Sequence, residues 1–300
     1  MPKTSFIDDR SLYVKTCHER SFAQLAKINI AARGELSFHI YEDDTLHGFK
    51  IDENKPLSRL YGRPFFVVRF VFANMDTSVS EKEEGRMRRL LMELKGQMDA
   101  QGGYYNIRLP GHITALMRAS NTVFEAPLFC GGTMEFYYSG HCPVPTLEPG
   151  MEMFFADTDY LRVHMERLKD IAAQSFNGYV GQYHISHETS AKADSIYASW
   201  VEMGLCDNKV IVVCASGEPV GFQLMDEMEY AVEAPLAAVT SQQRGKGIFG
   251  TMLAEGANFA AEQDKYFVMA TQFENYPSMR VMLSLGPIPY KAYYNVHVST

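Results

Sequence analysis

A glycine-rich loop between an apolar strand and an apolar helix constrains the fold of this chain more than any other feature. The strand pattern is EAPLAAVT (residues 233–240), the loop is SQQRGKG (241–247), and the apolar residues that follow recur at helical spacing. Glycines let the backbone of such a loop approach a ligand closely, and the N–H groups at a helix start attract a phosphate. The order strand, loop, helix therefore predicts an α/β fold with an anion site at this helix.

The loop fits two motifs. Residues 245–250 spell G-x-G-x-x-G, the dinucleotide-binding pattern, whereas residues 242–247 spell Q-x-x-G-x-G. A dinucleotide fold places its first glycine directly after its first strand and needs several more strand–helix units downstream. Here four polar residues (240–243) precede the glycine-containing part, and about 50 residues follow the loop. We therefore favour Q-x-x-G-x-G and keep the dinucleotide pattern as the alternative.

Charge and composition exclude several classes of protein. Lys and Arg number 28 against 36 Asp and Glu, and a formal net charge of −8 argues against a nucleic-acid binder. The N-terminal sequence lacks the apolar stretch of a secretory signal, and no apolar run is long enough for a membrane span. The five cysteines include no C-x-x-C pair, so neither a disulfide framework nor a zinc site is expected. We expect a cytoplasmic protein without a metal.

The chain is predicted to contain two α/β blocks. In the first, PFFVVRFVFA (64–73) has the composition of a buried strand, and apolar residues between 80 and 98 repeat on one helical face, with Ser80 and Glu83 as a capping box. Strands at 103–109 and 132–140 flank a helix at 113–120. Three prolines in residues 140–150 mark a linker. We therefore predict an N-terminal α/β domain (1–145) and a second domain (146–300), and no sequence repeat is apparent.

The second block continues the alternation. Its expected elements are a strand (151–156), helices (161–176 and 193–205), strands (209–215 and 218–230), the strand–loop–helix, a strand (266–273), a short helix and a final strand.

This order, together with Q-x-x-G-x-G at 242–247 and N-x-x-S-x-R at 275–280, resembles the GCN5-related N-acetyltransferase (GNAT) superfamily. Within it, the chain is most similar to the nucleotide-amino-sugar N-acyltransferases, of the dTDP-amino-dideoxyhexose type. That closer resemblance is carried by residues 183–204, RGKG, ATQFEN (270–275) and F-E-x-P-L-F-x-G-G-T-M-E-F (124–136). It implies an α/β fold with a mixed sheet: a C-terminal GNAT fold with a splayed central sheet, preceded by a smaller N-terminal α/β domain.

The resemblance also implies an acyl-CoA site. Acyl-CoA would lie between strands at 234–239 and 266–273, with the N–H of Ala237 or Ala238 polarising the thioester carbonyl. Asn275 would bind the pantetheine arm, although an Asn before Tyr-Pro could equally cap a helix. The residues implied for acyl-CoA binding are Leu236, Ala237, Val239, Gln242, Arg244, Gly245, Lys246, Gly247, Ile248, Asn275, Ser278 and Arg280.

One position departs from the superfamily pattern. Many members carry a tyrosine on the short helix after the Asn, where its hydroxyl can protonate the departing thiolate, but the matching residue here is Met282. Either another group donates the proton, or none is needed because a thiolate leaves readily. The tyrosines nearby in the sequence are Tyr276, Tyr290, Tyr293 and Tyr294.

The acceptor amine is expected at a loop in the second block. It holds Tyr179, Tyr183, His184 and His187, with His184 as a candidate general base and both histidines as candidate binding residues. Surface or structural histidines are the alternative. The spacing of the two histidines does not suggest a metal site.

The function implied is transfer of a short acyl group, acetyl or 3-hydroxybutanoyl, from acyl-CoA to the amine of a nucleotide-linked amino-dideoxy sugar in surface-polysaccharide (O-antigen) synthesis. The expected partners are acyl-CoA and the sugar nucleotide, and a homodimer is a possible assembly. Two alternatives stay open: a catalytically silent protein that binds CoA or a nucleotide sugar, for which Met282 is the main support, and an N-acyltransferase for another small amine.

Overall fold

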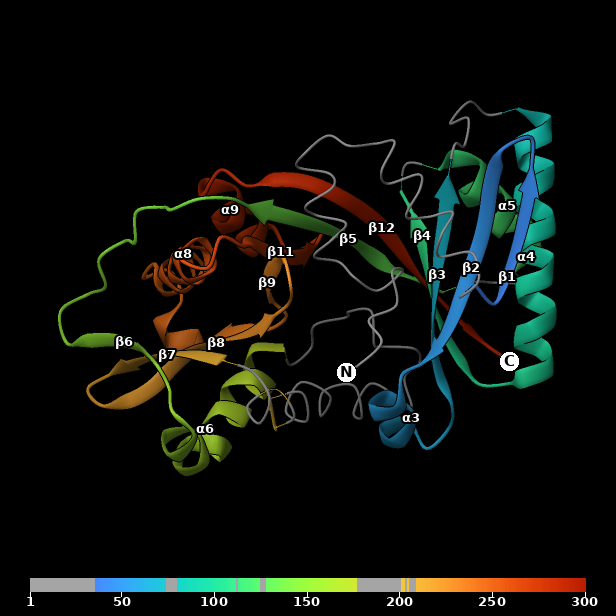
Figure 1. The fold of residues 1–300 in the computed structure, drawn as a ribbon. Helices are drawn as coiled ribbons and strands as arrows, with labels where there is room; N and C mark the ends of the chain where they lie inside the picture. Colours follow the sequence, from blue (N-terminus) through green and yellow to red (C-terminus); the bar gives the residue numbers. More distant parts are fainter. Residues whose placement is uncertain are drawn as a thin grey trace. The chain divides into compact units, whose positions relative to one another are not determined.

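The computed structural model describes residues 36–73, 80–111, 113–124, 128–176, 201–202, 204 and 209–300. The chain divides into two compact units. Unit 1 comprises Met1–Thr133, Val180–Thr189 and Lys291–Thr300, and unit 2 comprises Met134–Tyr179 and Ser190–Tyr290. Both combine a sheet with helices, so the predicted mixed α/β class is confirmed (Figure 1).

Unit 1 is a mixed sheet with strand order β1-β2-β3-β4-β12. Neighbouring strands are antiparallel except β3 and β4, which are parallel. The strands are β1 (Phe38–Glu42), β2 (Thr45–Glu53), β3 (Phe65–Ala73), β4 (Tyr104–Pro110) and β12 (Ile288–Ser299), and the helices are α3 (Lys55–Tyr61), α4 (Glu81–Gln101) and α5 (Thr114–Val123).

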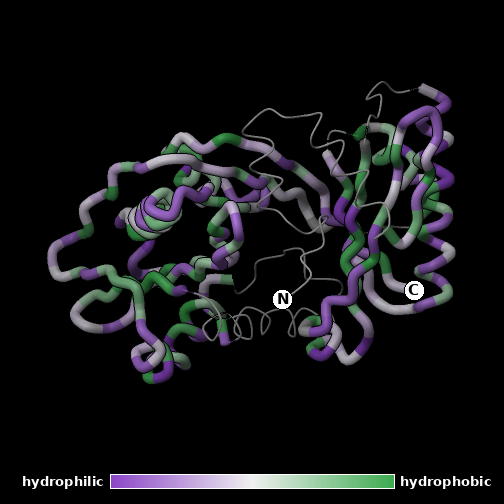
Figure 2. Tube along the Cα trace, viewed as in Figure 1, coloured by the Kyte–Doolittle hydropathy of each residue, from purple (hydrophilic) through white to green (hydrophobic). Residues whose placement is uncertain are grey.

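Helix α4 forms where the apolar periodicity predicts it. The residues predicted for one helical face are all fully buried, and α4 and α5 together cover one face of the sheet. These residues are Met87, Leu90, Leu91, Leu94 and Met98. Figure 2 shows hydrophilic and hydrophobic residues alternating along α4. The capping box is only half formed: Ser80 Oγ accepts a hydrogen bond from Glu83 N at 3.2 Å, but the Glu83 carboxylate binds His47 and Arg86.

Unit 2 has the strand order β5-β11-β9-β8-β7-β6, with β10 paired to β8. Helix α8 packs on β8 and β11 through an apolar core. The elements are β5 (Leu128–Tyr138), β6 (Met151–Phe155), α6 (Thr158–Phe176), β7 (Lys209–Ala215), β8 (Glu218–Glu227), β9 (Ala231–Ala234), β10 (Ala237–Val239), the 3-10 helix η2 (Ser241–Gln243), α8 (Ile248–Ala261), β11 (Tyr266–Gln272) and α9 (Tyr276–Ser284).

Residues 139–150 contain no helix or strand, as expected for the predicted linker. The two compact units meet earlier in the sequence than this linker, between Thr133 and Met134 within β5. The domain boundary at 145/146 therefore stays a prediction. The helix expected at 193–205 lies largely outside the described residues.

The two halves of the chain repeat one topology, although their sequences show no repeat. If α3 of the first half and β10 and η2 of the second are left out, the order β1-β2-β3-α4-β4-α5-β5 corresponds to β7-β8-β9-α8-β11-α9-β12. In both, a hairpin is followed by a strand antiparallel to it, a helix, and a strand parallel to that third strand. The last strand of each half joins the other unit: β12 pairs with β4, and β5 neighbours β11.

We predict that Leu94→Ala lowers the free energy of unfolding by about 2–5 kcal/mol, because it leaves a cavity among fully buried side chains under α4. Urea denaturation measures the change. Met92→Ala on the same helix is the control, since Met92 is 56% exposed and should change stability by less than about 0.5 kcal/mol. Equal losses for the two variants would contradict the assigned helix face.

Candidate functional site

The strand expected at 233–240 is two strands, β9 and β10, separated by Pro235 and Leu236. Proline has no N–H to donate to a ladder, so the pairing is interrupted there. The register records the break: Glu233 pairs with Asp226 of β8, whereas Ala237 pairs with Gln223. From Glu233 to Ala237 the chain advances four residues, whereas β8 advances three, from Asp226 to Gln223. The extra residue forms a β-bulge.

The break separates β10 from β11. β9 pairs in parallel with β11 from Tyr266↔Ala231 to Met269↔Ala234, where the described ladder ends. β11 continues to Gln272, while β10 pairs antiparallel with β8. The predicted splay between these strands therefore begins after Ala234 and Met269, and the next residue of β11, Ala270, is exposed.

The ladder with β8 fixes the direction of the β10 backbone groups. Leu224 N donates to Leu236 O at 2.8 Å, and Thr240 N donates to Val220 O at 2.9 Å. Because alternate residues of an antiparallel strand face the same neighbour, Ala238 also directs its N–H toward β8. Ala237 and Val239 direct theirs away from β8. Of the two candidate oxyanion donors, Ala237 therefore has the more suitable orientation.

The loop after β10 depends on two glycines. Gly245 has φ 80° and Gly247 has φ 78°, a left-handed conformation that favours glycine. A Cβ at either position would meet no atom within 4 Å, so conformation rather than crowding requires glycine. Gly247 is the N-cap of α8, no side chain caps it, and the first turn contains no acidic residue. The start of α8 is thus suited to an anion.

Two cations accompany this loop. Arg244 donates from Nε to Val239 O (3.3 Å) and from Nη2 to Ser175 O (3.4 Å), while Ser175 Oγ also donates to Val239 O (3.2 Å). Arg244 therefore braces the loop against β10 and α6. Lys246 pairs with Glu148 (3.1 Å), and both side chains are partly exposed.

Other predicted acyl-CoA residues flank the loop. Leu236, Val239 and Ile248 are buried, whereas Gln242 is exposed. On α9, Ser278 is half-buried and Arg280 is exposed.

Asn275 is the N-cap of α9. Its Oδ1 accepts a hydrogen bond from Ser278 N at 3.3 Å, so the capping alternative describes its local role. The cap uses the amide oxygen, and a ligand contact would have to come from Nδ2. Met282 is 5% exposed and lies in the core with α8 residues, which agrees with a packing role.

The predicted acceptor residues Tyr179, Tyr183, His184 and His187 lie outside the described residues. In the described ranges, no helix has the length and apolar character to cross a membrane. Among the same residues, no three His, Cys, Asp or Glu side chains gather as metal ligands.

The corresponding helix start in unit 1, that of α4, is built differently. Ser80 caps it, and its first turn carries Glu81, Glu83 and Glu84. These carboxylates already complement the helix dipole and would repel a phosphate. The repeated topology therefore provides one glycine-capped helix start in unit 2 and an acidic one in unit 1.

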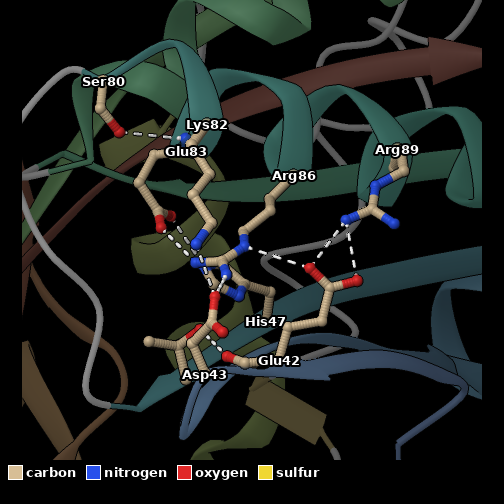
Figure 3. A network of polar contacts seen from close by, with 9 residues as sticks. Glu42, Asp43, His47, Ser80, Lys82, Glu83, Arg86 and Arg89 are labelled. Carbon is tan, nitrogen blue, oxygen red and sulfur yellow. Dashed lines mark hydrogen bonds and ion pairs between the residues drawn. The ribbon is translucent and has the colours of Figure 1, made fainter.

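An ionic network surrounds the start of α4, and its central residues His47, Glu83 and Arg86 are buried (Figure 3). Arg86 binds Glu83 and Asp43, each at 2.6 Å, and His47 Nε2 hydrogen-bonds Glu83 Oε2 at 2.9 Å. Lys82 pairs with Asp43, and Arg89 pairs with Glu42. The network ties the β1–β2 turn to α4. Burial lowers the pKa of His47, since a buried imidazolium loses hydration, and Glu83 only partly opposes this shift.

Comparison with solved structures shows the GNAT fold, whereas no family model and no curated protein sequence matches the chain. A GCN5-related N-acetyltransferase from Sphaerobacter thermophilus has a TM-score of 0.56 at 9% identity, covering 91% of this chain and 85% of that one. A tandem GNAT protein from the clavulanic acid biosynthesis pathway has 0.51 at 10%, covering 92% and 87%. A functionally unknown conserved protein from Staphylococcus epidermidis has 0.51 at 10%, covering 88% and 94%. The predicted GNAT fold is confirmed.

We predict that acidification destabilises the protein in part through His47. Because the folded-state pKa is lowered, the unfolded chain binds the proton first, and the free energy of unfolding falls as the pH drops below about 6.5. The loss ends below the folded-state pKa. Urea denaturation between about pH 7.5 and 5.5 should show a shallower decline for His47→Gln than for the parent. His39→Gln, at an exposed position on β1, should keep the parent slope. Equal slopes for parent and His47→Gln would refute this role.

We predict that Met282→Ala lowers stability by about 2–5 kcal/mol and changes the rate of acyl transfer by less than about tenfold, because a buried thioether packs but donates no proton. Thermal unfolding and thiol release measure the two effects. Leu283→Ala, at a residue 51% exposed on the same helix, is the control. A loss of several orders in turnover without a loss of stability would show that Met282 acts in the chemistry.

Proposed function

We propose that this protein transfers an acyl group from acyl-CoA to an amine. The observation that carries the proposal is the start of α8. It has a left-handed glycine N-cap, no side-chain cap and no acidic residue in its first turn, and a short loop joins it to a strand that parts from its neighbour. The GNAT fold of the chain supports it. An anion site beside an unpaired strand edge suits acyl-CoA, because its pyrophosphate can bind at the helix start while the amides of its pantetheine arm pair with the strand.

The proposal assigns the parts of acyl-CoA to parts of the site. The pyrophosphate binds N–H groups of the loop and first turn of α8, and the amides of the pantetheine arm pair with the free edge of β10. Arg244 donates a hydrogen bond to Val239 O and so fixes the loop against β10. Lys246, which is paired with Glu148, can instead pair with a phosphate of the ligand. The full proposed set remains Leu236, Ala237, Val239, Gln242, Arg244, Gly245, Lys246, Gly247, Ile248, Asn275, Ser278 and Arg280.

The proposed chemistry needs an oxyanion donor and a route for two protons. The Ala237 N–H, directed away from β8, stabilises the negative charge that develops on the thioester oxygen during amine attack. The CoA thiolate can leave without a donor, since its conjugate thiol has a pKa of about 8.5, and Met282 is then no obstacle.

The finer assignment rests on the sequence resemblance. We propose that the acceptor is a nucleotide-linked amino-dideoxy sugar of O-antigen synthesis and that acetyl or 3-hydroxybutanoyl is transferred. Tyr179, Tyr183, His184 and His187 are its proposed binding residues. A cytoplasmic location, homodimer assembly and the domain boundary at 145/146 belong to the same proposal.

The second candidate function is a silent protein that binds acyl-CoA, and the buried Met282 at the tyrosine position favours it. Turnover of acetyl-CoA distinguishes the two candidate functions. Release of free thiol from acetyl-CoA in the presence of a dTDP- or UDP-linked amino sugar supports transfer, whereas acetyl-CoA binding without thiol release supports the silent protein.

The phosphate assignment predicts that charge at Gly247 decides CoA affinity. Asn and Asp both tolerate a left-handed backbone and have nearly the same shape, so Gly247→Asn and Gly247→Asp differ mainly in charge. A carboxylate beside the pyrophosphate should weaken CoA binding by about tenfold or more relative to Asn. Isothermal titration calorimetry measures both affinities.

Pantetheine, which lacks the pyrophosphate, supplies the ligand control: its affinity should be equal in the two variants. Gly217→Asp, at another left-handed glycine in an exposed turn, should leave CoA affinity unchanged. Equal CoA affinities of Gly247→Asn and Gly247→Asp would remove the pyrophosphate from this helix start.

A further inference from the structure

A buried carboxylate in unit 2 belongs to none of the predicted sites. Glu135, on β5, is 2% exposed, and the Tyr290 hydroxyl, on β12, donates a hydrogen bond to Glu135 Oε2 at 2.7 Å. Burial of a carboxylate is costly without such donors. A carboxyl group buried at this position in a largely apolar strand therefore requires an explanation.

The pair lies on the face of the sheet opposite α8. Phe136 belongs to the core that packs on α8, with its neighbours Met134 and Tyr138 against the same core. Side chains alternate along a strand, so Glu135 and Tyr137 point to the other face. There the Tyr137 ring makes edge contacts with Tyr266 and with Tyr290, each at 5.8 Å between centroids.

The pair also lies near the start of the splay. β5 neighbours β11, and Tyr137 near the end of β5 contacts Tyr266, the first residue of β11. Because the end of β5 lies beside the start of β11, the two strands can run side by side only if they are antiparallel. Going back along β5 from Tyr137 to Glu135 then corresponds to going forward along β11, toward Val268 and Ala270. The ladder between β11 and β9 ends between these two residues, at Met269.

We propose that Tyr290 and Glu135 accept the proton of the attacking amine, with Tyr290 as the catalytic residue and Glu135 as the residue that positions and deprotonates it. This inference rests on the proposed acyl transfer. The amine nitrogen forms a bond to the thioester carbon, and the C–S bond breaks with its electron pair leaving on sulfur. The amine proton passes to Tyr290 Oη as the Tyr290 proton passes to Glu135 Oε2. Protonated Glu135 then returns its proton through Tyr290 to the thiolate or solvent.

The chemistry of the pair suits this step. The phenol oxygen can accept a hydrogen bond from the amine while its hydrogen is held by the carboxylate, which makes it a base through a one-proton relay. The rings of Tyr137, Tyr266 and Tyr290 favour a cationic amine beside a carboxylate. The acceptor class so selected is a primary amine near the face of β11 away from α8. It arrives as an ammonium ion, loses one proton to solvent to expose its lone pair, and gives the second proton to Tyr290 as it attacks.

Tyr290→Phe and Glu135→Gln test the proposal, with Tyr138→Phe as the matched control. Tyr138 lies on the same strand as Glu135 but on the opposite face, where its hydroxyl donates a hydrogen bond to His141 O, so its loss should be neutral for rate. The probes are acetyl-CoA with dTDP-4-amino-4,6-dideoxyglucose, and acetyl-CoA alone, where water replaces the amine. Thiol release reports both reactions.

We expect each test variant to lower kcat by about 10²-fold or more, with acetyl-CoA affinity unchanged by calorimetry. The acidic limb of the pH–rate profile should be lost in Glu135→Gln. The double variant should be no slower than either single one, because the two residues act as a unit. A merely structural pair would lower the melting temperature without removing that limb.

The possible results separate the two proposals. Parent-like kcat and pH profiles in Tyr290→Phe and Glu135→Gln, with transfer intact, would overturn the relay and leave the acyl transfer standing. A parent protein that binds acetyl-CoA but releases no thiol with either probe would overturn both, in favour of the silent protein. Loss of rate in Tyr138→Phe equal to that in Tyr290→Phe would also overturn the relay.

Discussion

The interruption of one β-ladder at Pro235 determines the rest of the candidate site. A strand without an N–H at this position cannot continue its pairing, and the bulge turns β10 toward β8 alone. Backbone groups on the other edge of β10 then need partners. Arg244 and Ser175 donate hydrogen bonds to Val239 O on this edge. The Ala237 N–H points to the same edge, away from β8. A ligand that pairs as an extra strand would complete this edge, which is the basis of the proposed pantetheine site.

Within the repeated topology, local sequence decides which half has a helix start suited to an anion. Both halves run strand, helix, parallel strand, but Gly247 opens α8 without a capping side chain, while Ser80 and three glutamates open α4. Around α4 the charges of unit 1 neutralise one another, and His47 is buried within them. The same order of strands and helices thus gives a helix start suited to an anion in one case and an ionic network in the other.

Local patterns predicted what local interactions determine. Apolar periodicity placed α4 and β3, and Ser80 was recognised as a cap because its partner is three residues away. The break in the strand at Pro235 was missed, although the proline itself was the available signal. Contacts between distant residues left no local pattern: His47 meets Glu83 across 36 residues, and Glu135 meets Tyr290 across 155. The motif of residues 242–247 located the loop but not the brace that Arg244 forms.

The last strand of each half pairs with strands of the other half: β12 pairs with β4, and β5 neighbours β11. This arrangement determines which proposed steps the second half could carry out alone. The proposed phosphate loop lies entirely within residues 241–248, so a fragment that begins at residue 146 would keep it. Such a fragment would lack β5, and β11 would lose its neighbour on the side away from β9. It would also lack Glu135, so Tyr290 would have no carboxylate to receive its proton. The proposed acyl-CoA binding therefore needs only the second half, whereas the proposed proton transfer needs a strand that precedes the proline-rich linker.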